Sequence, residues 1–451
     1  METLKRSPRL RVHRPLLIRA KRIITCDTDA PQCGIGFDAL GCIEDAAIFC
    51  LGGRVATLGP RRAVERELEE IDELFARTMR AMGMPEERIE KRFRYADDPH
   101  WRSRIVEFDF PAGTVVPGFV DAHTHPLFAG DRVADFEARL RGEPPPQGMR
   151  HTVERTREAL LDVRTFWEQT VEPRLYGLLR HGTTTAEVKT GYALHEPGER
   201  ALLDLIADHA DDLGTPRLIA TFLGAHALPP EFETEEAYVD YLIEHCLPTA
   251  KAHGAIYADV FCEPGYFSAV QARRYLEAAR AHGLRLRAHC DEMGYAGAAR
   301  MAAALGVDAA DHCNTVTSDD VRALAERGVV MVACPATIEY LELAHRAPVR
   351  EMLERGGTVA LASDFNPGTS PCYNLQTVAH LGRKLFGLSA AEALYAVTLA
   401  AAESLHIDLG RLFPGAPADM VVLQMERPEE FGWQFGGNQA VAVFREGEIV
   451  P

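Results

Sequence analysis

Residues 116–125 read Val116-Pro117-Gly118-Phe119-Val120-Asp121-Ala122-His123-Thr124-His125, an apolar run that ends in two histidines. Side chains alternate between the two faces of a strand, so residues two apart point the same way. His123 and His125 therefore present their imidazoles side by side, the spacing needed by two ligands of one metal ion. Two surface histidines in a loop share this spacing, but this pair closes a strand and has candidate partners downstream. We interpret the pair as part of a catalytic metal site.

Composition places the chain among ordinary soluble globular proteins. Its 451 residues, 47% hydrophobic and 25% charged, suit one large barrel with an appendage, or two domains. No run of about 20 apolar residues predicts a membrane span, and no apolar segment follows the charged N-terminus as in a secretory signal. The net charge of −17 argues against nucleic acid as a partner. It also means that an acidic substrate needs a specific local cation.

The ten cysteines are scattered singly, and no Cys-x-x-Cys pair exists. This pattern argues against a structural zinc knuckle and predicts reduced thiols in a cytoplasmic protein. Several of the cysteines stand in apolar strand-like runs, where cysteine behaves as a small buried hydrophobe: Cys262, Cys290, Cys313 and Cys334.

Short β-rich runs alternate with amphipathic helical stretches from residue 114 to residue 365. Helices are expected between the strands, over segments such as 153–180, 197–213 and 267–282. Eight such strands over about 250 residues predict a (β/α)8 barrel. A doubly wound open sheet is the alternative, but no Gly-x-Gly-x-x-Gly follows any of these strands. The expected strands are 115–123, 183–189, 217–224, 256–262, 284–289, 307–311, 328–334 and 358–364.

The flanking segments differ from the barrel. Residues 1–60 and 409–451 hold alternating apolar runs, and Gly52-Gly53-Arg54 is a hairpin signal. They predict one small β-sandwich domain formed by both termini. Residues 61–105 have helical spacing of apolar residues and predict a helical insert, with peripheral support or a subunit contact as its favoured role. The barrel is then assigned to residues 106–408.

Polar residues gather where the predicted barrel strands end, the place where active sites of such barrels lie. Three or four nitrogen and oxygen donors with an open position are what a hydrolytic metal needs, since the ion lowers the pKa of its water to about 7 and polarises the attacked carbonyl. A carboxylate beside that water can accept its proton and pass it to the leaving nitrogen, and Asp364 suits this role. The collected residues are His123, His125, His226, His289, Asp311, His312, Ser363 and Asp364.

A single histidine at a strand end is more often structural than a ligand, and 17 histidines place some there by chance. Five histidines and an aspartate at the strand ends of one barrel favour the metal site. For His226 and His312, two interpretations are equally favoured: direct ligation of the metal, and contact with the substrate or with a metal ligand. Lys189 would bridge metals if carbamylated, but a structural or surface role is favoured, and Glu263 is interpreted as structural.

The motifs resemble the amidohydrolase superfamily and, within it, the imidazolonepropionase family. The resemblance to the superfamily covers nearly the whole chain outside the insert and includes the closing segment 410–419. The narrower resemblance rests on the segments 123–132 (His-Thr-His-Pro-Leu-Phe-Ala-Gly-Asp-Arg), 187–192 (Glu-Val-Lys-Thr-Gly-Tyr), 222–226 (Phe-Leu-Gly-Ala-His), 289–292 (His-Cys-Asp-Glu) and 364–370 (Asp-Phe-Asn-Pro-Gly-Thr-Ser).

The resemblance implies opening of the ring of 4-imidazolone-5-propanoate by water, to give N-formimino-L-glutamate in histidine degradation. It implies one divalent metal per chain, zinc or iron, held by His123, His125, His289 and Asp364. It further implies an anionic small-molecule substrate and a homodimer. Arg132 would bind the propionate, Glu292 would contact the ring and shuttle a proton, and His312 would orient or polarise the carbonyl. The other implied substrate contacts are Tyr192, His226, Asn366, Gly368 and Thr369.

The loop 142–151 departs from the family, which carries an aromatic residue and a Gly-Gly-Gly run there. That loop would border the pocket, so an amidohydrolase of another carboxylate-bearing cyclic amide is one alternative. A second is an aminohydrolase that deaminates a purine, pyrimidine or related heterocycle, although Arg132 and Tyr192 favour a carboxylate. A third alternative is a catalytically inactive barrel with a structural role. Such a protein is expected to have lost one or more metal ligands, and none is missing from this sequence.

Overall fold

The computed structural model describes residues 14–81 and 101–450. Eight parallel strands form one sheet in sequence order, which confirms the predicted (β/α)8 barrel. Backbone bonds between the eighth and first strands close it: Asp364 N–H donates to the His123 carbonyl (3.0 Å), and His125 N–H donates to the Phe365 carbonyl (2.9 Å). The barrel strands are β5 (Phe119–Thr124), β6 (Thr183–Lys189), β7 (Arg217–Ala225), β8 (Tyr257–Cys262), β9 (Arg285–Cys290), β10 (Ala309–His312), β11 (Val330–Ala333) and β12 (Val359–Leu361).

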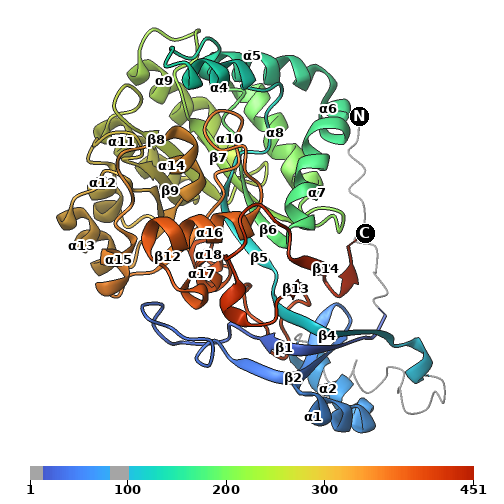
Figure 1. Cartoon of the computed structure of the whole chain (residues 1–451). Helices are drawn as coiled ribbons and strands as arrows, with labels where there is room; N and C mark the ends of the chain where they lie inside the picture. The colour runs from blue at the N-terminus through green and yellow to red at the C-terminus, as the bar shows by residue number, and fades with distance from the viewer. Residues whose placement is uncertain (1–13, 82–100, 451) are drawn as a thin grey trace.

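Helices follow the barrel strands and surround them (Figure 1). Several begin where the sequence supplies a cap, as at Ser268 and Thr317, whose side chains accept from the third backbone N–H of their helices. They are α4 (Val133–Leu140), α5 (Gly148–Ala159), α6 (Val163–Phe166), α7 (Glu172–Arg180), α8 (Glu196–Asp208), α9 (Glu235–Tyr241), α10 (Leu247–Ala250), α11 (Ala269–Ala281), α12 (Ala298–Leu305), α13 (Ser318–Glu326), α14 (Pro335–Leu341), α15 (Val349–Glu354), α16 (Leu375–Phe386), α17 (Ala390–Ala396) and α18 (Leu399–Ser404).

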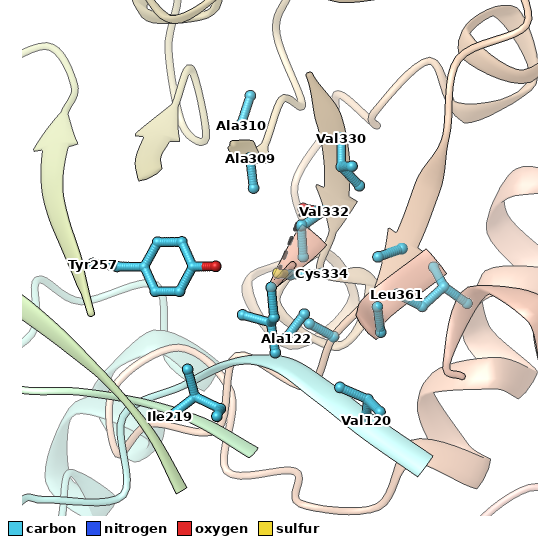
Figure 2. Close-up of a cluster of buried hydrophobic side chains, with 14 of the residues drawn as sticks. Val120, Ala122, Ile219, Tyr257, Ala309, Ala310, Val330, Val332, Cys334 and Leu361 are labelled. Carbon is cyan, nitrogen blue, oxygen red and sulfur yellow. Dashed lines mark hydrogen bonds between the residues drawn. The ribbon is translucent and has the colours of Figure 1, made fainter. Parts of the chain in front are cut away.

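The main hydrophobic core lies among these strands and the helices around them. Figure 2 shows part of it, with Val120, Tyr257 and Leu361 contributed by three different strands. The four cysteines predicted to be buried hydrophobes are buried. No helix of the described residues is long and apolar enough to cross a membrane.

Strands from both ends of the chain form a second sheet, as predicted. These strands are hydrogen-bonded in one seven-stranded sheet, where the sequence suggested a sandwich, and Figure 1 shows blue, cyan and red segments side by side in it. The Gly52-Gly53 turn joins β2 to β3, with positive φ at both glycines (58° and 77°), as a tight hairpin requires. In sheet order the strands are β15 (Glu448–Ile449), β14 (Ala440–Arg445), β13 (Met420–Gln424), β4 (Val106–Pro117), β1 (Leu16–Ile24), β2 (Cys42–Leu51) and β3 (Arg54–Pro60).

The start of the barrel differs from the expected residue 106. β4 pairs with β1 and β13 in the terminal sheet, and the first barrel strand begins at Phe119. The single strand expected at 115–123 is therefore two strands in two sheets. The chain changes sheets at Gly118, where a Cβ would collide with the Thr184 side chain. Only glycine allows this approach between the two sheets.

Within the helical insert, α1 (Arg61–Glu67) and α2 (Ile71–Ala81) pack against the terminal sheet. Val64, Leu68 and Leu74 share a hydrophobic cluster with Leu17 and Phe49 of the sheet. This contact fits the expected role of peripheral support. Residues 82–100 of the insert lie outside the described residues.

Candidate active site

The barrel brings the first two histidines together as their spacing predicts. His123 is the last residue but one of β5, His125 directly follows the strand, and their Nε2 atoms lie 3.1 Å apart. Asp364, just beyond β12, places its Oδ1 3.4 Å from both Nε2 atoms. His289 of β9 completes the group, because its ligand atom and those of His123 and His125 lie within 4.8 Å of one another. All four side chains are buried.

Buried carboxylates hold two of these histidines from behind. His123 Nδ1 lies 2.7 Å from Asp311 Oδ2, and His289 Nδ1 lies 3.1 Å from Asp259 Oδ2. Such a carboxylate fixes the ring orientation and makes the other ring nitrogen a better ligand. The sequence placed Asp311 at a strand end beside His312 without a role of its own, and it did not single out Asp259, although an aspartate in an apolar strand is an available signal.

Lys189 lies beneath the histidines, fully buried and surrounded by carboxylates. Its Nζ is 2.7 Å from Asp259 Oδ2, 2.8 Å from Glu187 Oε1 and 3.5 Å from Asp311 Oδ2. Burial alone would lower the pKa of Lys189, but Asp259 and Glu187 outweigh it and raise the pKa above its ordinary value. The amine is therefore a protonated structural cation, which agrees with the favoured interpretation of Lys189 and places it inside the barrel instead of on the surface.

The donor set fits a divalent metal ion. Imidazole nitrogens and carboxylate oxygens are the ligands of hydrolytic zinc and iron sites. Burial and Lys189 lower the pKa of His123, but Asp311 and Asp364 outweigh them and raise it to about 9. The cluster thus favours a positive charge among its imidazoles, and a metal ion is the cation that would replace the proton.

The other predicted residues line one cavity of about 160 Å³ together with His125, His289 and Asp364. His123 lies below it and is fully buried. The residues that the cavity brings together from separate loops are Arg132, Tyr192, His226, Glu292, His312, Asn366, Gly368 and Thr369.

Two histidines of this cavity are neutral. His226 Nδ1 donates to the Gly191 carbonyl (3.0 Å), and burial next to His289 lowers the pKa of His226 to about 3. Burial also lowers the pKa of His312 to about 3, and neither of its ring nitrogens has a hydrogen-bond partner among the described residues. His312 has φ of 68° and Asp364 of 50°, which costs about 1–3 kcal/mol for each non-glycine residue. The backbone is therefore strained at these two residues, whose side chains line the cavity.

Glu292 is a buried carboxyl group near His312. Its Oε2 lies 3.8 Å from His312 Nε2, and burial, Asp364 and Glu263 raise the pKa of Glu292 well above its usual range. Glu263, interpreted as structural, accepts backbone N–H groups from Glu292, Met293 and Gly294. It therefore fixes the loop that carries Glu292.

Arg132 is coupled to the loop that departs from the family pattern. Its Nε donates to Asp135, and the same carboxylate accepts the backbone N–H of Gln147 (2.7 Å) and of Gly148 (3.1 Å). Pro145 and Met149 of this loop line the cavity, as expected. The loop thus both borders the cavity and positions the guanidinium within it.

Two residues of the site, Thr337 and Arg139, carry no clear sequence signal. Thr337 of α14 donates to Asp364 Oδ2 (2.6 Å), which turns Oδ1 toward the histidines. Arg139 of α4 lines the cavity with Arg132. Asn366 was singled out, and its amide carbonyl accepts the N–H groups of Gly368 (2.9 Å) and Thr369 (2.8 Å), so it shapes the wall opposite the histidines.

This barrel has relatives among known proteins. Residues 114–450 match the amidohydrolase family, and the chain belongs to this family. Among curated proteins it is similar to the imidazolonepropionase of Solibacter usitatus, at 36% identity over 446 residues, 96% of this chain and 98% of the relative. The imidazolonepropionase of Rubrobacter xylanophilus is 42% identical over 347 residues, 74% of this chain and 81% of the relative.

Solved structures show the same fold. Escherichia coli guanine deaminase superposes with a TM-score of 0.64 at 19% identity, covering 97% of this chain and 99% of that one. A triazine hydrolase of Arthrobacter aurescens gives a TM-score of 0.64 at 19% identity, over 97% of this chain and 94% of the other. Structures at this level of sequence identity show the fold alone, so the substrate is inferred from the residues that line the cavity.

Proposed function

We propose that this protein hydrolyses 4-imidazolone-5-propanoate to N-formimino-L-glutamate. The observation that carries the proposal is the position of Arg132, whose guanidinium lines the same cavity as the buried histidines and Asp364. A cation facing a hydrolytic site selects a substrate that bears a carboxylate near the bond to be cleaved. The names of the full-length relatives agree with this substrate.

We assign His123, His125, His289 and Asp364 as the ligands of one divalent ion, zinc or iron, in each chain. Such an ion, when bound, acidifies water and polarises a carbonyl. Asp364 would accept the proton of the water that attacks the cyclic amide carbonyl. Its Oδ1 faces the histidines while Thr337 holds Oδ2, so the basic oxygen has a fixed direction. We also propose that the protein is a homodimer.

The cavity residues complete the reaction. Neutral His312 would orient the carbonyl, and protonated Glu292 would contact the ring and move a proton toward the leaving nitrogen, so that the C–N bond breaks as nitrogen gains its proton. Tyr192 and His226 would hold the ring on one side. Asn366, Gly368 and Thr369 would form the opposite wall of the substrate site.

An Arg132→Gln variant tests the substrate. We expect kcat/KM for 4-imidazolone-5-propanoate, followed by its ultraviolet absorbance, to fall about 10- to 100-fold, because a hydrogen-bonded charge partner contributes about 1.5–3 kcal/mol. Arg164→Gln, an exposed residue paired with Glu168, is the matched control and should behave like the wild type. Metal-loaded wild-type protein without turnover would refute this substrate and favour a deaminase or a different cyclic amide.

Removal of the metal tests the ligand assignment. Dialysis against a chelator should abolish turnover, and addition of zinc or ferrous ion should restore it at about one ion per chain by elemental analysis. His289→Ala should bind metal more weakly than the wild type, whereas exposed His245→Ala should not. Full activity in protein free of metal would contradict the assignment.

A further inference from the structure

We propose that Arg139 is a second cation for the substrate carboxylate, which is bound between the guanidinium groups of Arg132 and Arg139. This inference rests on the proposed function and assigns a specificity-determining residue to it. Within the described residues, these two are the only arginine or lysine side chains that line the cavity.

The helix α4 places both arginines on one side of the cavity. Arg132 directly precedes α4 and Arg139 stands in its last turn, and a separation of seven positions, about two helical turns, returns the side chain to the same helix face. Both approach Gly368: Arg139 Nη2 donates to the Gly368 carbonyl (3.3 Å), and Arg132 Nη1 lies 3.3 Å from where a Cβ on Gly368 would be. The two guanidinium groups therefore flank a single residue of the wall.

The charge balance shows why Arg132 alone is insufficient. Asp135 is fully buried and accepts from Arg132 Nε, and its backbone hydrogen bonds outweigh burial and hold its pKa below the ordinary value. Asp135 is therefore ionised, and the Arg132–Asp135 pair has no net charge. An anion that contacts Arg132 still needs a positive charge nearby, in a protein whose own net charge is −17.

Arg139 supplies that charge because it has no acidic partner in the part of the chain that the structure describes. Its Nη1 is buried without a hydrogen-bond partner there, and its guanidinium lies over the Tyr340 ring, 5.1 Å from the centroid. Leaving a buried donor of a cation unpaired is unfavourable. By contrast, Arg141, two residues further on, contacts Glu143 (2.9 Å) and Glu137 (3.7 Å). A carboxylate at Arg132 would satisfy the unpaired donor of Arg139.

The test compares two substrates in the metal-loaded protein, 4-imidazolone-5-propanoate and its propanamide analogue, which keeps the ring and removes the charge. Arg139→Gln should raise KM for the carboxylate about tenfold with little change in kcat, the size expected for one charge-assisted hydrogen bond. KM for the amide should be equal in variant and wild type. Arg139→Lys should recover part of the loss, because it keeps the charge without the planar fork, and Arg141→Gln should match the wild type.

Two results would overturn the inference. One is an unchanged KM for the carboxylate in Arg139→Gln; the other is an equal rise for both substrates, which would mean that Arg139 acts only by supporting Gly368. Wild-type turnover is measured first, so the proposed function is judged separately. Absence of wild-type turnover refutes the proposed function and this inference together, whereas wild-type turnover with a flat Arg139→Gln response refutes the inference alone.

Discussion

Asp364→Asn is expected to lower kcat about 10³-fold while leaving the protein folded. An amide has the shape of the carboxylate but cannot accept the proton of the attacking water, and a positioned general base contributes about 10²- to 10⁴-fold. The side chain should keep its place, because Thr337 donates to its Oδ2 (2.6 Å) and an amide oxygen can accept that bond. Steady-state kinetics with metal content measured on the same samples would separate lost chemistry from lost metal.

A second measurement on this variant uses the metal-free protein. Asp364 is one of the carboxylates that raise the pKa of His123 to about 9, so its replacement by asparagine should lower that pKa. A histidine titration by NMR would follow the shift. Asp319→Asn, at an exposed site paired with Arg322, is the control and should change neither kcat nor the titration of His123. A metal-loaded Asp364→Asn variant with the kcat of the wild type would show that Asp364 is not the general base.

The barrel and its ligand positions follow from local sequence patterns. The alternation of side chains along β5 places His123 and His125 on the same face, and each strand end brings its polar residue to the same rim of the barrel. His289 and Asp364 needed no long-range information beyond the order of the strands. The site could therefore be predicted, because the C-terminal ends of successive barrel strands lie side by side at one rim of the barrel.

The boundary of the barrel was not readable in this way. Residues 115–117 and 119–123 form one continuous strand-like pattern, and both parts are buried strands. What separates them is the packing of Gly118 against Thr184, which is 66 residues away in the sequence and becomes a neighbour only when the barrel closes. A glycine in a strand signals close approach of another segment, but it does not say which segment approaches.

The supports of the ligands were predicted only in part, since a structural role was expected for Lys189 but none for Glu187 or Asp259. Lys189 and Glu187 stand in β6 and Asp259 in β8, and each alone is an ordinary charged residue in a strand. Their role depends on the contacts that Lys189 of β6 makes with Glu187 of the same strand, with Asp259 of β8 and with Asp311 of β10. Arg139 and Thr337 likewise acquire a role only through what they contact across the cavity. Contacts between side chains of different strands depend on the tertiary structure, so local sequence patterns do not predict them.

Lys189→Met is expected to weaken both the fold and the metal site. The methionine has a similar length but leaves Glu187, Asp259 and Asp311 with Arg287 as their buried cation, 2.9 Å from Asp311 Oδ1 and 4.0 Å from Glu187 Oε1. Removing one partner of a buried ionic group typically costs about 3–5 kcal/mol, so the free energy of unfolding should fall by that amount. Chemical denaturation would measure it, with Lys384→Met as the control, because its exposed pair with Glu339 contributes about 0–1 kcal/mol.

The metal affinity of Lys189→Met should fall about 10- to 100-fold, the usual effect of disturbing groups that orient metal ligands. Lys189 contacts Asp259 and Asp311, and these carboxylates lie against His289 Nδ1 and His123 Nδ1, so its loss reaches two ligands at once. The double variant Lys189→Met/Glu187→Gln removes one of the unpaired negative charges and should regain part of the stability but less of the affinity, since Glu187 is not paired with either histidine. Equal stability of Lys189→Met and Lys384→Met would show that the buried carboxylates do not need this cation, and normal metal affinity would show that Asp259 and Asp311 hold their histidines without it.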